Sequence, residues 1–235
     1  ALERQVLTNF SASNLLASDF ADVTARKGNF NASMLRGSDF SGADLSGSSF
    51  KSSDLREADF SGANLTGSTF SVSDLRECRF DRANLTDCTF STLDLADASF
   101  NRTILTRTAF NKSGLTRTKF TDAQLVNVRL SMTDLRETIF EHCVFTGVDF
   151  TYSDLRGQRL DGQTFIGVRF DKAALDGVSF KGATLKNVSL LSASILSRKY
   201  YRAIRTINFD GAMMDKLTYA ALRNLDADLS KVTII

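Results

Sequence analysis

A large apolar residue stands at every fifth position through most of this 235-residue chain. The stretch SDLREADFSGANLTGSTF, residues 53–70, shows the spacing with Leu55, Phe60, Leu65 and Phe70. The series runs from Phe10 to Ile195 through 38 positions without a change of register, and all are Leu, Phe or Ile except Ala25. A helix repeats every 3.6 residues and a strand every two, so neither alone explains a period of five.

The residue two places before each large one is nearly always small, as at Ala58 and Ser68; Leu93, Gln158 and Gln163 are the conspicuous exceptions. Two inward groups two residues apart match the alternation of a short extended segment. The outward residues that follow must then turn a corner. Of the 14 glycines, 11 lie two places after the large residue, where a corner needs unusual backbone angles.

A second period of 20 residues lies on the first. Phe dominates the multiples of ten and Leu the positions between them. If four units close one coil, the large residues sort into two Leu columns and two Phe columns. A coil of 15 would alternate Leu and Phe up every column and should pack less uniformly. The sequence therefore predicts an all-β solenoid of square cross-section, with about nine coils and a length of roughly 45 Å at strand spacing.

The repeat resembles the pentapeptide-repeat family, whose pattern is approximately A(D/N)LXX. It occurs as Ala43-Asp44-Leu45, Ala63-Asn64-Leu65 and Ala83-Asn84-Leu85. The resemblance covers about four fifths of the chain. It implies a right-handed quadrilateral β-helix in which each coil contacts only its neighbours.

Three segments are expected: an N-terminal cap at 1–9, the β-helix at 10–195 and a helical C-terminal cap or dimerisation segment at 196–235. In the last segment we expect a basic helix, then one or two degenerate repeat units at 208–215 (the decayed repeat), and then a second helix with Asp215 as its N-cap. It either covers the last coil or forms a dimer or partner surface, and the resemblance implies a twofold homodimer. The candidate residues are Tyr201, Ile204, Ile207, Leu222 and Leu225.

No window is long and apolar enough to span a bilayer, and the N-terminus lacks a signal-peptide pattern. The sequence thus predicts a cytoplasmic protein, with delivery to a host cell left open. Because the chain begins with Ala, we expect a processed chain or a domain of a longer one.

Few residues suit catalysis. The single histidine, His142, lies at an outward corner, and the three cysteines, Cys78, Cys88 and Cys143, occupy small inward positions. Phosphate loops, dinucleotide fingerprints and hydrolase motifs are absent from the sequence. The expectation is a non-enzyme without cofactor or metal.

Acidic side chains form one predicted wall: Asp54, Asp74, Asp94, Asp134 and Asp154 recur along one column. Arg36, Arg56, Arg76, Arg136 and Arg156 lie across the Leu ladder from them. One interpretation is a ladder of screened ion pairs. The other is an acidic wall that mimics DNA.

Basic side chains form a predicted belt around the middle of the rod. Arg102, Arg107, Lys112 and Arg117 take the same corner position on all four walls, with Lys119 beside them, and residues 98–120 contain no acid. The belt is either neutralised by neighbouring acids or a docking site for an acidic protein partner.

The function expected is that of a non-catalytic protein-binding scaffold, alone or as the recognition domain of a larger bacterial effector. The alternative, implied by another branch of the family, is a DNA mimic that binds DNA gyrase and protects it from inhibitors. A net charge of +2 and a small belt argue against both mimicry and direct nucleic-acid binding.

Overall fold

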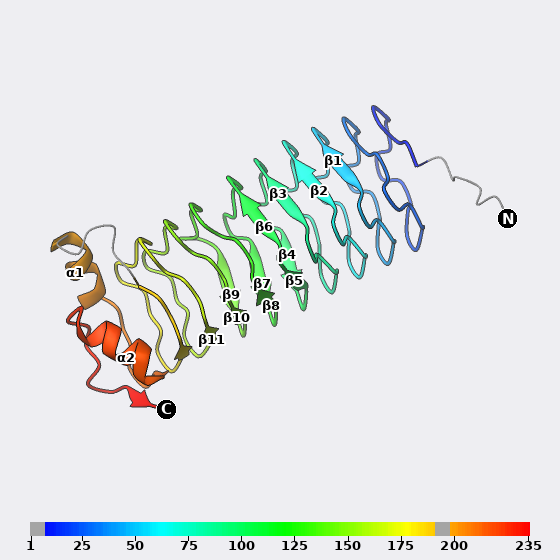
Figure 1. The fold of residues 1–235 in the computed structure, drawn as a ribbon. Coiled ribbons are helices and arrows are strands. Elements are labelled where there is room, and N and C mark those ends of the chain that lie inside the picture. Colours follow the sequence, from blue (N-terminus) through cyan, green and yellow to red (C-terminus); the bar gives the residue numbers. More distant parts are fainter. Residues whose placement is uncertain (1–7, 191–197) are drawn as a thin grey trace.

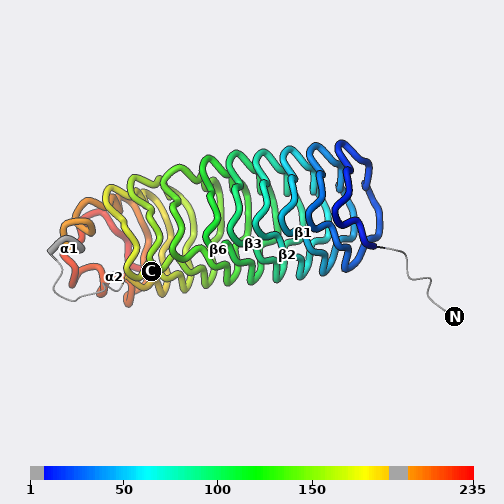
Figure 2. The backbone as a smooth tube through the Cα atoms, turned by 90° about the horizontal axis from the view of Figure 1, so that it is seen from above, coloured from blue at the N-terminus to red at the C-terminus, as the bar shows by residue number. Residues whose placement is uncertain are grey.

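The structure, a computed structural model, describes residues 8–190 and 198–235. It is a parallel β-solenoid of about nine coils, a rod that ends in two short helices (Figures 1 and 2). The strands are β1 (Ser49–Lys51), β2 (Thr69–Ser71), β3 (Thr89–Ser91), β4 (Ser99–Asn101), β5 (Ile104–Thr106), β6 (Ala109–Asn111), β7 (Lys119–Thr121), β8 (Gln124–Val126), β9 (Ile139–Glu141), β10 (Val144–Thr146), β11 (Thr164–Ile166), β12 (Thr184–Lys186), β13 (Met213–Met214) and β14 (Thr233–Ile234). The helices are α1 (Arg198–Arg205) and α2 (Lys216–Arg223).

One coil takes 20 residues, as predicted. Strand partners from β1 to β12 differ by 20 in number, for example Phe50 and Phe70, whereas β12 and β13 pair across 29 residues. Leu55 N–H donates to the Asp74 carbonyl at 2.9 Å, and Leu75 N–H donates to that of Asp94 at 2.8 Å. The four-walled coil inferred from the Leu and Phe columns is therefore confirmed.

The four walls differ in how regular their strands are. The four-stranded face holds β1-β2-β3-β6, the three-stranded face β4-β7-β9 and the seven-stranded face β14-β13-β12-β11-β10-β8-β5. The fourth, the Leu15 face, is held by isolated bridges such as Asp54 to Asp74. These names are kept below.

Two stacks of phenylalanine fill the core. Along each stack, from Phe10 to Phe110 and from Phe20 to Phe140, ring centroids are 4.7–5.2 Å apart. Across the core the two stacks meet edge to face, as Phe30 and Phe40 do at 5.5 Å and 90°. Both arrangements bury large apolar area in a narrow tube, which is the main source of stability.

The stacks are interrupted once each in the second half of the rod, at Leu130 and Leu160, where the smaller side chain leaves volume in the core. Phe145 and Phe165 stand in the neighbouring Leu column and are stacked 4.7 Å apart. Phe145 lies 5.4 Å from Phe140 and Phe165 lies 5.3 Å from Phe180. The exchange of Leu and Phe between columns keeps the tube filled.

Corners adopt the left-handed backbone conformation whether or not they carry glycine. Gly62 has φ +69°, and the non-glycine corners Glu57 and Arg117 have φ +61° and +53°. A side chain in this region costs on the order of 1 kcal/mol. Every fifth residue from Ala12 to Asn187 makes this turn except Glu137, so glycine only marks the corners where the strain is relieved.

The N-terminal cap expected at 1–9 lies outside the described residues except for Thr8 and Asn9.

At the C-terminal end, the first helix is described over Arg198–Arg205. The decayed repeat continues the core, since Phe209 stacks on Phe180 at 5.6 Å and Met214 pairs with Leu185. Asp215 caps α2, accepting from Thr218 N–H at 3.0 Å. The final VTII segment contributes β14, which pairs with β13.

Side chains of this cap bind backbone groups that the last coil would leave open. Thr206 Oγ1 accepts from Gly177 N–H at 2.7 Å. Asp215 Oδ2 accepts from Asn187 N–H at 3.0 Å and Thr218 Oγ1 from Val188 N–H at 3.1 Å. The cap thus satisfies an open strand edge that would otherwise template association.

Leu115→Asp tests the core, because Leu115 is only 1% exposed. A carboxylate there has no room to hydrate, so we expect the free energy of unfolding to fall by at least about 3 kcal/mol. Thermal denaturation followed by circular dichroism measures the loss. Thr116→Asp, on the exposed side of the same unit, is the control and should change stability by no more than about 0.5 kcal/mol. Equal melting of the two variants would contradict the filled-tube description.

Candidate partner-binding surfaces

The predicted basic belt is assembled as expected. Arg102, Arg107, Lys112 and Arg117 all lie at left-handed corners, with φ between +50° and +53°. Arg107 binds Asp87 through two parallel hydrogen bonds of 2.6 and 2.9 Å. Arg117 binds Asp97 in the same way, at 2.8 and 2.6 Å, with Glu137 at 3.9 Å.

The belt is consequently weaker in charge than its sequence indicates. Arg102 adds a longer pair of 3.8 Å to Asp122. The hydrogen bonds from Arg107 and Arg117 hold the pKa of Asp87 and Asp97 below the usual range, so these carboxylates stay charged. Within the described part of the chain, Lys112 and Lys119 form no ion pair. Two of the five cations therefore remain without a carboxylate.

The predicted acidic wall is also paired. On the Leu15 face, Arg56 contacts Asp54 at 2.5 Å and Asp74, one coil on, at 3.7 Å. Arg76 repeats this with Asp74 and Asp94 at 2.6 and 3.8 Å. Further along, Arg136 lies 2.7 Å from Asp134 and 3.5 Å from Asp154, which also binds Arg156 at 2.6 Å.

Arg56, Arg76 and Arg136 thus each join the aspartate of their own coil to that of the next, whereas Arg36 pairs with Glu57 at 2.5 Å. The arginine hydrogen bonds lower the pKa of Asp54 and Asp74, which fixes both as anions. The wall is therefore a ladder of ion pairs, in which arginines neutralise the negative charge of the aspartates.

The candidate cap residues turn mainly inward. Ile204, Ile207 and Leu222 are buried in the core cluster, while Leu225 packs against it and is half-buried. Tyr201 is also half-buried. In this position they cover the last coil, so a dimer would have to use other parts of the segment, such as the exposed Ile235.

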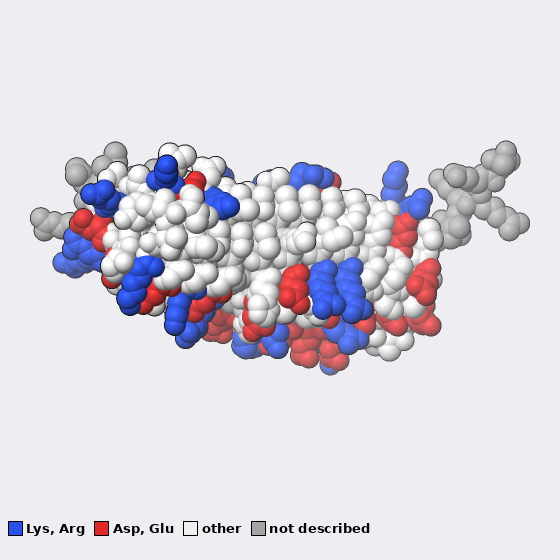
Figure 3. Space-filling view, turned by 90° about the horizontal axis from the view of Figure 1, so that it is seen from below, with Lys and Arg blue, Asp and Glu red and all other residues white. Residues whose placement is uncertain are grey.

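A surface that sequence reasoning missed is the outside of the seven-stranded face. From residue 64 to 184, none of its outward residues is charged: Asn64, Thr66, Asn84, Thr86, Ile104, Thr106, Gln124, Val126, Val144, Thr146, Thr164, Ile166 and Thr184. We call this the uncharged face. Figure 3 shows a broad uncharged surface along the rod, bordered by charged side chains. Ile104 is 50% exposed, and Val144 and Ile166 are each 40% exposed.

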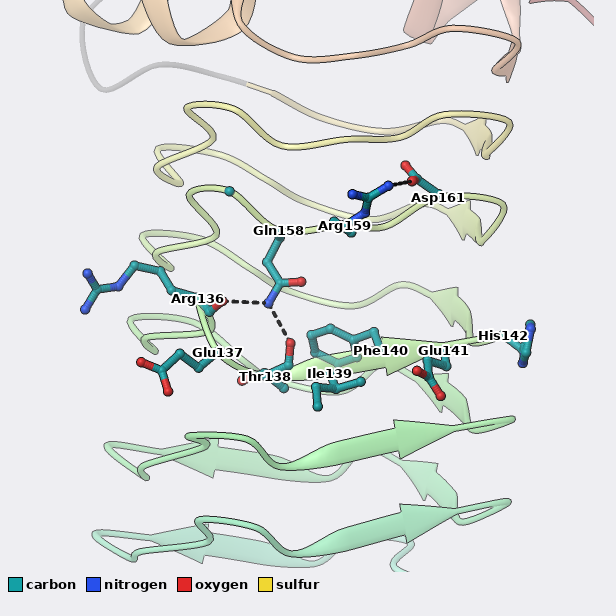
Figure 4. A pocket seen from close by; sticks show the side chains of 11 residues that line it. Arg136, Glu137, Thr138, Ile139, Phe140, Glu141, His142, Gln158, Arg159 and Asp161 are labelled. Carbon is teal, nitrogen blue, oxygen red and sulfur yellow. Dashed lines mark hydrogen bonds and ion pairs between the residues drawn. The ribbon is translucent and has the colours of Figure 1, made fainter.

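The uncharged face lies beside one local opening in the β-ladder. Between β9 and residues 159–161, the usual inter-coil hydrogen bonds are missing in the described chain. On the same face one coil earlier, Ile139 N–H donates to the Thr118 carbonyl at 2.9 Å; one coil later, Ser179 N–H donates to that of Gln158 at 2.9 Å. A cleft of about 660 Å³ occupies the opening (Figure 4).

Gln158 lines this cleft. It stands at a small inward position, and its side-chain Nε2 donates to the Thr138 carbonyl at 2.6 Å and to that of Leu135. Figure 4 shows the bond to Thr138 and a longer one, of 3.3 Å, to the Arg136 carbonyl. In a closed ladder the Thr138 carbonyl would accept from Arg159 N–H. Gln163, the next exception, donates Nε2 to the Phe140 carbonyl at 3.1 Å and accepts from Cys143 N–H at 3.2 Å. Both glutamines were visible in the sequence as breaks in the small-residue pattern.

The Leu15 face has a smaller irregularity next to Gly114. Leu115 N–H and Asp134 N–H form no inter-coil bond in residues 8–190 and 198–235. Arg117 N–H donates to Glu137, one residue further than the register of the other coils.

Ordinary inward positions bond to the preceding coil through short polar side chains. Ser53 Oγ donates to the Phe30 carbonyl at 2.7 Å and Thr138 Oγ1 to that of Leu115 at 2.9 Å. Cys78 Sγ does the same to Leu55 at 2.9 Å. Each partner lies 23 residues earlier, directly beneath. A hydroxyl or thiol spans this distance at normal coil spacing. Gln163 also reaches the carbonyl 23 residues earlier, that of Phe140, while β10 and β11 stay paired. The opening at Gln158 therefore goes with the bond from its Nε2 to the Thr138 carbonyl, which Arg159 N–H would otherwise use.

The cysteines are core residues, as predicted: all three are free and buried. Burial raises the pKa of Cys88 to about 12 and that of Cys143 to about 11, and it raises the pKa of Cys78 as well. His142 is exposed, with Nδ1 3.6 Å from Asp122. No cluster of three or more His, Cys, Asp or Glu side chains placed to hold a metal ion occurs in the described residues.

A square solenoid built from five-residue units is a repeat scaffold, and the comparisons identify which one. The chain belongs to the pentapeptide-repeat family: the family described as pentapeptide repeats (8 copies) matches twice, at residues 13–51 and 53–91, and the pentapeptide repeat region matches 93–165. No curated protein matched the chain in sequence.

Solved structures share the fold. HetL, a pentapeptide-repeat protein involved in heterocyst differentiation regulation in Nostoc sp. strain PCC 7120, is 20% identical, with 86% of this chain and 89% of HetL covered and a TM-score of 0.68. QnrB1, a plasmid-mediated fluoroquinolone resistance protein, is 19% identical, with 90% and 94% covered and a TM-score of 0.42. The TM-score with HetL supports a common fold, and function has to be argued from this chain.

Neither α1 nor α2, at eight residues each, could cross a bilayer, and no other helix is described.

Thiol labelling tests the burial of the cysteines. Since burial raises each pKa, the reactive thiolate is disfavoured at pH 8, and we expect native protein to resist iodoacetamide. In denaturant all three thiols should react, as counted by mass spectrometry. The same shift means that the free energy of unfolding falls as the pH rises above about 8.5, the pKa of an unfolded thiol. Rapid labelling of the native chain would show that the tube opens.

Proposed function

We propose that this protein is a non-catalytic scaffold that binds another protein through the uncharged face. The observation that carries the proposal is the long outer surface without charge on the seven-stranded face, with Ile104, Val144 and Ile166 at its centre. Protein interfaces are depleted of charged residues at their core and polar at their rim. Exposed apolar patches of this kind commonly mark interaction sites.

The rim of the face has the matching composition. Arg102 and Arg107 stand at the two corners that border it, each paired with an aspartate, Asp122 and Asp87. We infer that part of the predicted belt acts as a rim: it orients a partner and contributes less affinity than the uncharged centre. Screened pairs of this sort are individually worth little.

The rigid core supports this role. Each coil is fixed by its neighbours through the ladder and the Phe stacks, so the face is presented with little conformational cost on binding. The partner that fits is a protein with a flat, weakly charged surface. Whether the chain acts alone or as the recognition part of a larger effector, and whether it dimerises through its C-terminal segment, remain predictions.

The DNA-mimic alternative has less support. Mimicry needs an array of unpaired negative charge, because the target expects phosphates. Here Asp54, Asp74, Asp134 and Asp154 are each held by an arginine at 2.5–2.7 Å.

Affinity capture with matched variants tests the scaffold proposal. The double variant Val144→Lys/Ile166→Lys places charge in the uncharged face and should lose the proteins that the parent chain retains from a lysate of its source organism. Val72→Lys/Met132→Lys is the control, since Val72 and Met132 are 58% and 74% exposed at corners away from that face. It should retain them.

The belt is tested in the same experiment. Arg107→Glu/Arg117→Glu should retain the same proteins, with binding weakened mainly at low salt. If this variant loses the partners while Val144→Lys/Ile166→Lys retains them, the binding site is the belt and not the uncharged face. Retention by every variant would contradict both.

A supercoiling assay tests the alternative. Because the aspartates are neutralised, we expect DNA gyrase to supercoil plasmid at the same rate with and without micromolar protein. Its inhibition by a quinolone should also be unchanged, and the drug serves as the positive control. Slower supercoiling, or protection from the drug, would favour mimicry over the scaffold.

A further inference from the structure

We propose that the cleft beside Gln158 accepts an extended peptide segment of a partner protein, which pairs with the solenoid as an added strand. The proposal extends the scaffold function to a second, distinct site. It rests on backbone groups that the opened ladder leaves unpaired.

The lower edge of the cleft is β9. Its Phe140 N–H and the following His142 N–H point toward the next coil, yet neither has a hydrogen-bond partner among the described residues. At the equivalent place three coils earlier, Phe80 N–H donates to the Ser99 carbonyl at 2.8 Å. Two N–H groups two residues apart on one strand are the spacing at which a parallel ladder donates.

The upper edge is the segment from Gln158 to Asp161. Arg159 N–H and the carbonyls of Arg159 and Asp161 would pair with β9 in a closed ladder, and no inter-coil bond of this kind is formed in the described chain. The two edges together offer three donors and two acceptors. The carbonyls of Thr138 and Phe140, which would add acceptors, are already occupied by Gln158 and Gln163.

Unpaired main-chain groups in two facing strands define the class of ligand. An open edge of this kind pairs with an extended chain, and the main-chain bonds supply much of the affinity in that mode of recognition. The cleft of about 660 Å³ is within the usual range for ligand sites, roughly 300–1,000 Å³.

One unpaired charge at one end gives the segment a polarity. On the upper edge, Arg159 and Asp161 pair with each other at 3.4 Å, so their charges offset one another (Figure 4). Glu141 lies on the lower edge, toward His142 (Figure 4). Glu141 is exposed and forms no ion pair within residues 8–190 and 198–235. The segment that fits is extended, with a Lys or Arg side chain at the Glu141 end.

The cleft is continuous with the uncharged face. His142 forms the corner after β9, and Val144, at the start of β10, is the next outward residue on the seven-stranded face. A partner seated on that face could therefore place one of its extended segments in the cleft.

A displayed library of linear ten-residue peptides, selected on the full chain, provides the probe. In the free protein the amides of Phe140, His142 and Arg159 should exchange hydrogen much faster than the paired amide of Phe80. A selected peptide should slow the exchange of all three. Most selected peptides should carry Lys or Arg near one end.

Gln158→Ser is the decisive variant, because a serine hydroxyl can reach the Leu135 carbonyl at ordinary coil spacing and let the ladder close. It should bind the selected peptides at least about tenfold more weakly, since the main-chain bonds are lost. Thr118→Ser, an inward position on the same face that keeps its hydroxyl, should bind them as the parent does. Should Gln158→Ser fail to fold, Glu141→Lys tests the same site from its surface and should weaken peptides with a basic end.

Three results would overturn the proposal: slow exchange of the three amides in the free protein, peptides whose affinity ignores both Gln158→Ser and Glu141→Lys, or peptides that leave the three amides unprotected. Its failure is separable from failure of the scaffold function. Partners retained from lysate and lost only on Val144→Lys/Ile166→Lys would leave the uncharged face intact as a binding site.

Discussion

The spacing of the coils, about 4.8 Å between hydrogen-bonded strands, is the constraint on which the rest of the structure depends. A side chain at a given place in one coil must pack on the residue 20 positions away at this distance. Phenylalanine meets the requirement, because ring centroids 4.7–5.2 Å apart are in contact over their faces. Isolated rings prefer offset or edge contacts. Here the ladder imposes the stacking, and the edge-to-face contacts between the two columns, such as Phe30 with Phe40, complete the core.

The same spacing decides what charges do on the outside. Aspartates stacked at one position would repel, and the Leu15 face resolves this with arginines two residues after most of them. Three of these, Arg56, Arg76 and Arg136, lie within 4 Å of two successive carboxylates. The spacing also explains why the basic belt is partly neutral, since Asp87 and Asp97 stand directly beneath Arg107 and Arg117. The net charge at a position on a solenoid surface therefore depends on the residue one coil away. By that measure the wall and the belt are largely balanced, and the face that stands out is the one without charge.

Much of the fold was predictable because each unit is determined locally. Period five, unbroken from Phe10, fixes the corners, the columns and the burial of the cysteines without knowledge of distant contacts. The ends were less predictable: the chain between Phe180 and Phe209 takes 29 residues to return to the same column, and only the coordinates show that Phe209 completes the stack. The uncharged face was also implicit in the sequence. It emerges only when outward residues are sorted by column, and an absence of charge is a weaker signal than a cluster of it.

Gln158 marks a place where the ladder is locally open. Its carboxamide bonds to the Thr138 carbonyl that Arg159 N–H would use in a closed ladder. Gln163, an equally long side chain, stands beside the paired strands β10 and β11. The opening stays on one wall: on the preceding wall Leu135 N–H donates to the Asp154 carbonyl at 2.9 Å, and on the following wall Val144 pairs with Thr164. Coils interact only with their neighbours, so a local opening does not propagate. A tube whose main chain is bonded coil to coil along most of its length can thus expose pairing groups on one wall while the neighbouring walls stay closed. That is the property a strand-binding site in this fold requires.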